Sequence, residues 1–300
     1  MCIRDRPPVH ATPSHAVRAA TGMLAALRRP AVDEADPAVR DDVDRAAARA
    51  LVERLVPQHG AGPVPLDAED VSSLLAAYGI PVLRSIRVAD AQEAVSAAEE
   101  LGYPVALKST DPVLRHRADL GGVRLGLADD AQLRRAHEEM RRELSFSSVP
   151  LEVQSMAAAG VPVVVRSTED PSLGPVVSLS LAGDATDLLD DIAYAIPPLS
   201  EQAASALVNA PATAVKLRGV RGLPPADRAA LADIVVRVGL LAEDLPEVAQ
   251  LELYPVVVAH SGAAVVGARV DLAQAPNRTD GARRVLGTVG DWMDDDSTSR

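Results

Sequence analysis

Strand-length apolar runs alternate with segments of helical periodicity from about residue 66 to residue 272. Apolar runs bounded by turn residues predict strands over residues 82–88, 103–108, 122–127 and 174–183. Spacings near 3.6 residues predict helices over residues 68–79, 90–102, 129–144, 200–209 and 224–245. This alternation of strands and helices favours a fold of the α+β (α/β) class.

Residues at the ends of these segments support the predicted helix boundaries. Asp67, Asp90 and Asp129 can each cap a helix N-terminus, and Gly79 can end the first of these helices. The long helix over residues 224–245 has proline in its first turn. Its predicted buried stripe is made of Leu231, Ile234, Val235, Val238 and Leu241.

Two pairs of apolar runs predict antiparallel neighbours. Residues 151–156 and 161–167 lie on either side of the small-residue sequence AAAG, which suggests that they form an antiparallel pair. Residues 249–259 and 262–272 flank a His-Ser-Gly sequence and predict a β-hairpin.

The chain divides by composition into three parts. We expect residues 1–65 to be a segment of helices and linkers, residues 66–272 to be the folded domain with lobes of about 66–150 and 151–272, and residues 273–300 to be a polar, disordered tail. Within the first part, helices are predicted over residues 13–28 and 44–55. Residues 1–6 read unlike the rest and are expected to be a scar of sequence assembly or cloning, so that the natural protein would extend further upstream.

Composition and charge narrow the class of protein. Apolar residues make up 48% of the 300 residues but aromatic residues only 2%, so the core must consist of aliphatic side chains. The net charge of −12 argues against nucleic acid and anionic membranes as partners of the whole chain. No apolar stretch is long enough to span a bilayer, and a cytosolic location is expected. Cys2 is the only cysteine, which excludes internal disulfides and cysteine-based zinc sites.

The strongest candidate for chemistry is Lys108, which closes the apolar run YPVALK. It is one of two lysines among 30 basic residues. The loop that follows, RHRADLGGVRL, contains His116, Asp119 and the pair Gly121-Gly122. An ammonium at a strand end and a Gly-Gly turn both suit phosphate binding. The alternative is a solvated loop between two strands.

Other common sites are missing from the sequence. It contains no P-loop, no dinucleotide-binding glycine fingerprint, no HExxH and no GxSxG. The paired acids Asp129-Asp130 and Asp190-Asp191 are typical of helix caps and solvated faces.

Seven ordered segments resemble the ATP-grasp domain of ADP-forming acyl-CoA synthetases, including actinobacterial versions fused to a GNAT-type acetyltransferase. The resemblance covers about residues 66–272, and residues 8–28 resemble the tail of the preceding CoA-ligase region. The matching segments are AAYGIPV, EELGYPVALK, RHRADLGGVRL, EDPSLGPVV, IPPLS, GVRGLPPAD and LPEVAQLELYPVVV.

This resemblance implies an ATP-grasp fold, in which two α+β lobes enclose a nucleotide cleft. It also implies ATP or ADP and Mg²⁺ as cofactors, and a CoA-binding domain or subunit as partner. The implied reaction is the reversible conversion of acyl-CoA, ADP and phosphate to acid, CoA and ATP, with the phosphoryl group carried on histidine.

The resemblance assigns roles to individual residues. Lys108 would hold the nucleotide phosphates, His116 would receive the γ-phosphoryl group, and Arg115 and Arg117 would stabilise the developing charge. The alternative for His116 is an exposed loop histidine. Further nucleotide-binding residues implied by the resemblance are Gly121, Gly122, Gln154 and Arg269, and implied metal ligands are Glu252 and Asp187.

The sequence departs from the family's metal-binding motifs. Tyr254 stands where the family has asparagine, Pro162 where it has glutamate, and Gly267 where it has aspartate. Magnesium prefers small oxygen ligands in a regular octahedron, so these changes predict a degraded metal site. Three readings stay open: part of a ligase, a non-catalytic regulatory ATP-grasp module of a GNAT-type acetyltransferase, or a pseudogene-like fragment.

Overall fold

A computed structural model describes most of the chain between residues 36 and 275. The described residues are 12–13, 16–17, 20–21, 36–56, 62–111, 114, 120–144, 149–170, 173–183, 191–219, 222 and 224–275. The chain divides into two units, residues 1–37 and residues 38–300, and the second unit contains both sheets. Most of the helix predicted over residues 13–28, and the tail beyond residue 275, lie outside the described residues.

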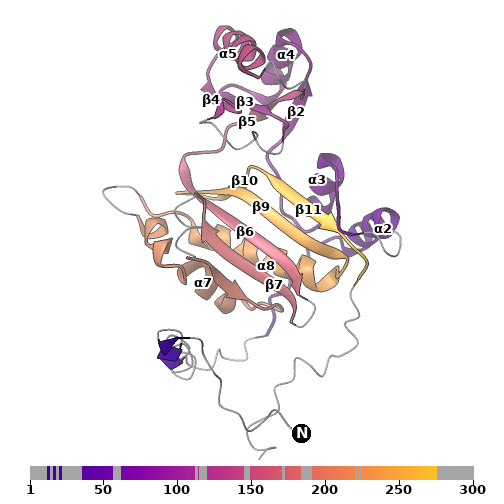
Figure 1. Ribbon diagram of the computed structural model, residues 1–300, viewed down its shortest axis with the longest axis vertical. Coiled ribbons are helices and arrows are strands. Elements are labelled where there is room, and N and C mark those ends of the chain that lie inside the picture. The colour runs from indigo at the N-terminus through magenta and orange to yellow at the C-terminus, as the bar shows by residue number, and fades with distance from the viewer. Residues whose placement is uncertain are drawn as a thin grey trace, which may run out of the picture. The chain divides into compact units, whose positions relative to one another are not determined.

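The larger sheet is antiparallel (Figure 1). One of its faces is apolar and belongs to the larger core. Its strands, in spatial order, are β1 (Val64–Pro65), β11 (Ala268–Leu272), β9 (Val248–Ala259), β6 (Gly160–Asp170), β7 (Gly174–Leu181) and β8 (Ala193–Ala195), with β10 (Ala263–Val265) paired to β9. On β9, Leu251 and Leu253 are buried in the core, so Glu252 and Tyr254 point to the opposite face.

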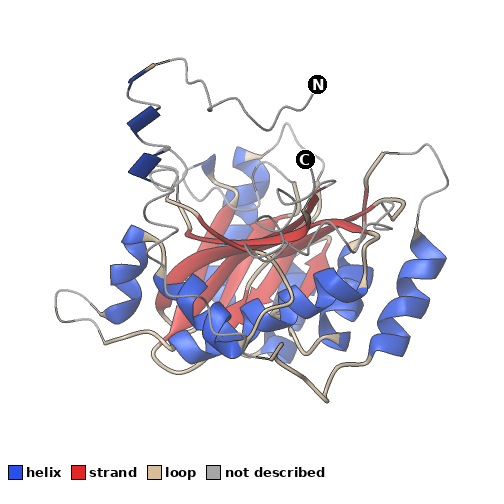
Figure 2. Ribbon diagram, turned by 90° about the horizontal axis from the view of Figure 1, so that it is seen from below, coloured by secondary structure: helices blue, strands red, loops and turns tan. Residues whose placement is uncertain are grey.

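Helices cover the apolar face of this sheet (Figure 2). They are α7 (Glu201–Asn209), the 3₁₀ helix η3 (Ala212–Arg218) and α8 (Arg228–Asp244), while α2 (Arg45–Leu55) and α3 (Ala68–Ala77) pack against the same core. The predicted stripe of α8 is buried throughout. The helix begins later than predicted, because the side chain of Asp227 accepts from the backbone N–H of Ala230 and leaves both prolines outside.

The smaller sheet has the order β2 (Ser85–Val88), β5 (Leu151–Ser155), β3 (Val105–Ser109) and β4 (Val123–Leu127). Helices α4 (Ala91–Leu101) and α5 (Asp130–Glu143) pack on it and share a separate apolar core with its strands. Asp90 and Asp129 cap these two helices, as the sequence predicts.

The AAAG sequence does not form the predicted turn of an antiparallel pair, and that prediction is wrong. Strand β5 pairs with β2 and β3, whereas β6 pairs with β7 and β9 in the other sheet. The small residues instead carry the chain from one sheet to the other. A Cβ atom on Gly160 would lie 2.3 Å from the carbonyl oxygen of Val258, so β6 can begin here only with glycine.

The expected division into lobes also differs from the packing. Strand β5 belongs to the smaller sheet, although it was expected to open the second lobe. Helix α3 packs in the core of the larger sheet, although it was expected in the first lobe. In both cases the core in which an element buries its apolar face decides to which lobe it belongs. The order of elements along the chain does not reveal this.

The β-hairpin predicted around His260 is confirmed by the pairing of β9 with β10 and β11. The turn is closed by a hydrogen bond from the N–H of Ala259 to the carbonyl of Gly262, 3.0 Å long. Gly262 has φ of +81°, a conformation that glycine adopts at little cost.

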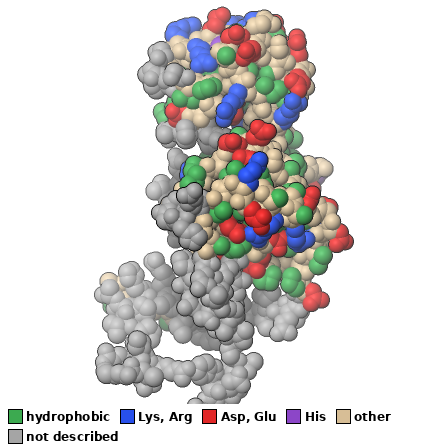
Figure 3. All heavy atoms as spheres, turned by 90° about the vertical axis from the view of Figure 1, so that its right-hand side faces the viewer, with side chains coloured by type: hydrophobic (Ala, Val, Ile, Leu, Met, Phe, Trp, Pro, Cys, Tyr) green, Lys and Arg blue, Asp and Glu red, His purple; other side chains and the backbone are tan. Residues whose placement is uncertain are grey.

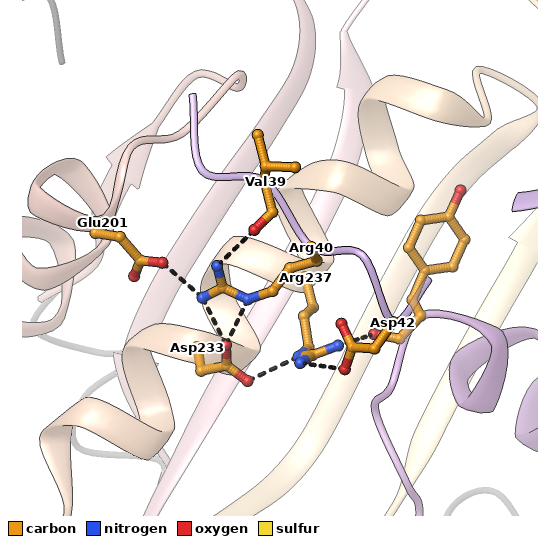
Figure 4. A network of polar contacts seen from close by, with 7 residues as sticks. Val39, Arg40, Asp42, Glu201, Asp233 and Arg237 are labelled. Atoms are coloured by element: carbon orange, nitrogen blue, oxygen red, sulfur yellow. Dashed lines mark hydrogen bonds and ion pairs between the residues drawn. The ribbon is translucent and has the colours of Figure 1, made fainter. Parts of the chain in front are cut away.

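A network of arginines and acids fastens the segment before α2 to the larger sheet's helices (Figure 4). The Arg40 guanidinium contacts Glu201 at 2.7 Å and Asp233 at 2.7 Å. The Arg237 guanidinium donates to Asp42 at 2.8 Å, to Asp233 at 2.7 Å and to the carbonyl of Tyr78 at 2.9 Å. Since Arg237 is only 9% exposed, its charge depends on these partners.

Charges of both signs are interspersed on the face of the molecule drawn in Figure 3. Over the described residues, no helix is both long enough and apolar enough to cross a membrane.

We predict that Arg237→Ala lowers the free energy of unfolding by about 2 to 3 kcal/mol, because it leaves acids and a buried carbonyl without their donor. Chemical denaturation measures the change. The matched control is Arg134→Ala, whose exposed pair with Asp130 should contribute about 0.5 kcal/mol or less. Equal losses in the two variants would contradict the structural role of the network.

We expect His137 on α5 to make the stability of the folded protein depend on pH. Its side chain is buried, and within the described residues its Nε2 atom has no hydrogen-bond partner. Burial lowers the pKa of His137, and the nearby Arg141 charge lowers it further, against the opposite effect of Asp90 and Glu138. The unfolded chain therefore binds this proton more readily than the folded chain.

We predict that stability falls as pH drops below about 6.5, the ordinary histidine value, and that His137→Phe removes this loss. Unfolding midpoints measured between about pH 7 and pH 5 test it. The acids with lowered pKa values, such as Asp233, lose their contribution only at lower pH. His260→Ala, which changes an exposed histidine, should keep the wild-type profile.

Candidate functional site

A cavity of about 440 Å³ opens between the two sheets of the second unit. The smaller sheet and the linker contribute Ala106, Lys108, Val123, Leu125 and residues 154–159. The larger sheet and its connections contribute Gly160, Pro162, Ala182, Gly183, Tyr254, Pro255, Val257 and Val266. Most of these side chains are small and apolar, so the cavity suits a flat apolar ring with few polar contacts.

Lys108 contributes the ammonium group of this cavity. It lies on β3, as predicted, and only 6% of the residue is exposed. Its Nζ atom donates a hydrogen bond to Oε1 of Gln154 on the neighbouring strand. Its cross-strand partner is Glu152, which is also buried. A buried ammonium held beside a cavity can form a charge-assisted bond with an anionic ligand.

Gln154 connects the lysine to both sheets. While its Oε1 accepts from Lys108, its Nε2 donates to the carbonyls of Leu83 and Val266, each at 2.9 Å. Val266 lies between β10 and β11 of the larger sheet. The same junction contains a β-bridge between Val82 and Val265. Gln154 was expected among the nucleotide-binding residues, and the structure places it in the cavity wall as a structural link.

The loop after Lys108 is only partly described. His116, Arg115 and Arg117 lie outside the described residues, so their predicted roles stay predictions. Gly121 and Gly122 are described, and the local backbone structure explains why glycine stands at both positions. Gly121 has φ of +77°, and a Cβ atom on Gly122 would lie 2.0 Å from the carbonyl oxygen of Leu114.

The predicted metal ligand Glu252 is engaged by an arginine. Its Oε1 accepts from Nε of Arg166 at 2.8 Å, and about a third of each side chain is exposed. Arg269, paired with Glu252 across the β9–β11 ladder, donates from Nε to Asp271 at 3.0 Å. This hydrogen bond and the Asp271 charge raise the pKa of Arg269, and Glu252 adds to the effect.

Of the two predicted metal ligands only Glu252 is described, and its described surroundings do not suit a magnesium ion. Glu252 lies between two guanidinium groups, and the neighbouring position on its face is a phenol, Tyr254. Asp187 lies outside the described residues. Within the described part of the chain, no three histidine, cysteine or acidic side chains gather in a metal-binding group.

Sequence reasoning missed Arg166. It stands in the apolar run VPVVVRS, and strand alternation alone would have put it on the face opposite Val165. Its partner could not be inferred, because the β6–β9 pairing includes a register shift between Val163 and Val165.

Comparisons with known proteins agree with this architecture. A sequence model of the ATP-grasp domain matches residues 60–272. The chain is 30% identical over 236 residues to the ADP-forming acetate–CoA ligase I subunit beta of Pyrococcus furiosus, covering 77% of this chain and 100% of that one. It is 33% identical over 271 residues to ADP-forming acetate–CoA ligase I of Archaeoglobus fulgidus, covering 87% of this chain and 38% of that one.

A solved structure has the same fold. The dinucleotide-forming acetyl-coenzyme A synthetase 1 of Ca. Korarchaeum cryptofilum, in complex with coenzyme A, Ca-AMPCP and HgCl⁺, superposes with a TM-score of 0.64 at 29% identity. The match covers 76% of this chain and 99% of that one. A second structure of that enzyme, with coenzyme A and Mg-AMPPCP, gives a TM-score of 0.59 at 32% identity, with 69% and 92% covered.

Two facing sheets with a lysine-lined cavity between them, matched over residues 60–272, define an ATP-grasp domain. The chain belongs to the beta-subunit family of ADP-forming acetyl-CoA synthetases. It spans only 28% and 38% of two longer relatives, the 4-hydroxybutyrate–CoA ligase of Nitrosopumilus maritimus and the Archaeoglobus ligase.

Proposed function

We propose that this chain binds ATP or ADP in the cavity between its sheets, as the nucleotide-binding part of an ADP-forming acyl-CoA synthetase-like ligase. The observation that carries the proposal is the buried ammonium of Lys108 at the wall of a mainly apolar cavity. The apolar part suits the base, and the lysine suits the phosphates. The related Korarchaeum enzyme was solved with Mg-AMPPCP and with coenzyme A.

In the ligase reading, His116 accepts the γ-phosphoryl group. One imidazole nitrogen forms a bond to the γ-phosphorus as the bond from that phosphorus to the β,γ-bridging oxygen breaks, and ADP leaves with the electron pair. Arg115 and Arg117 stabilise the charge on the transferred group. A CoA-binding domain or subunit then completes the cycle, since some relatives are separate beta subunits.

The alternative is a regulatory module. Tyr254, Pro162 and Gly267 replace the oxygen ligands expected from the family, and the carboxylate of Glu252 already accepts from Arg166. A domain with this degraded metal site would bind nucleotide without transferring phosphate. It would then act as a non-catalytic ATP-grasp module of a GNAT-type protein acetyltransferase.

We predict that Lys108→Ala weakens ADP binding by about 10- to 150-fold, the equivalent of a lost charge-assisted hydrogen bond. Isothermal titration calorimetry measures the change. Lys216→Ala is the matched control, because it removes the other lysine of the chain from an exposed position on η3. Unchanged affinity in Lys108→Ala, with wild-type folding, would exclude the role of Lys108.

We predict that incubation with γ-labelled ATP and Mg²⁺ leaves an acid-labile, base-stable label that His116→Ala abolishes and His260→Ala retains. Acid and base treatment followed by peptide mapping identifies the labelled residue. A wild-type protein that binds nucleotide and takes up no label would favour the regulatory module over the ligase.

A further inference from the structure

The face of the larger sheet opposite its apolar core carries a row of four polar residues across four adjacent strands. Cross-strand pairing joins Ser178 on β7 to Arg166 on β6, Arg166 to Glu252 on β9, and Glu252 to Arg269 on β11. Adjacent strands lie about 4.8 Å apart, so the carboxylate is flanked at close range by a guanidinium on each side.

This row continues the wall of the cavity. Tyr254 lines the cavity, and Glu252 lies two residues before it on the same strand and therefore on the same face. Pro162 lines the cavity from β6, the strand that also carries Arg166. A polyphosphate that begins at Lys108 and runs along this face would reach the arginines.

The charges of the row balance when Asp271, the partner of Arg269, is counted with it. Arg166 and Arg269 contribute two positive charges, and Glu252 and Asp271 contribute two negative charges. A divalent cation at Glu252 would have to displace Arg166 or lie next to two guanidinium groups. An anion, by contrast, can bind here without displacing either arginine. Arg166 uses only its Nε atom toward Glu252 among the described residues, and the Arg269 side chain is 64% exposed, so terminal N–H groups can still donate.

We infer that Arg166, held by Glu252 and assisted by Arg269, takes the place of the divalent cation, so that nucleotide binds to this chain without Mg²⁺. The inference rests on the proposed nucleotide binding. Guanidinium groups suit this role because their planar N–H donors bind phosphate oxygens in pairs and their charge does not depend on pH.

The test is ADP binding measured by calorimetry, in excess EDTA and in excess Mg²⁺. For the wild-type protein we expect dissociation constants that agree within about threefold, far less than the loss of one charge-assisted contact. Arg166→Ser should weaken binding in EDTA by about 10-fold or more, and Mg²⁺ should recover part of the loss, because Glu252 is now free to hold a cation. The control is Arg134→Ser, which removes an exposed arginine paired with Asp130.

Glu252→Gln gives an independent test if Arg166→Ser folds poorly. If Glu252 only holds Arg166, this variant keeps or strengthens ADP binding in both buffers. If Glu252 were a metal ligand, the variant would lose affinity in Mg²⁺ alone, which would overturn the inference. A wild-type protein that needs Mg²⁺ to bind ADP would also overturn it and leave the proposed function intact. Binding in neither buffer would overturn both.

Discussion

The junction of the two sheets depends on how a buried ammonium is accommodated. Lys108 can stay charged inside the protein only if polar partners replace its hydration, and Gln154 is one of them. The same amide group donates to carbonyls at Leu83 and Val266. One side chain therefore places the candidate ligand-binding charge and joins the smaller sheet to the larger one.

The segment that connects the two sheets at this junction also forms part of the apolar wall of the cavity. The chain crosses between the sheets through Met156 and three alanines; none of them brings a charge into the gap, and the alanines bring little bulk. Gly160 then allows β6 to start in contact with the backbone of β9. The ligand space is left open by small residues at the crossing, and its polar lining residues are Lys108, Gln154, Ser155 and Tyr254.

Residues 38–56 lie before the family match, and ion pairs attach them to the domain. The match begins at residue 60, yet Arg40 and Asp42 contact Asp233 and Arg237 on α8. Ala48 and Val52 on α2 are buried in the same core as the larger sheet. Residues 38–56 are therefore part of the folded structure, because both their charges and their apolar side chains find partners on it.

Local pattern determined most of the elements and one site residue. Helix caps such as Asp90, the stripe on α8 and the strand that ends in Lys108 are short-range features, because caps and periodicity are set within one or two turns. The family resemblance supplied the ATP-grasp fold, which the comparisons confirm. The tertiary structure alone decided that β5 and β6 belong to different sheets, and that Arg166 holds Glu252. Both depend on register between strands far apart in the sequence, which no local pattern encodes.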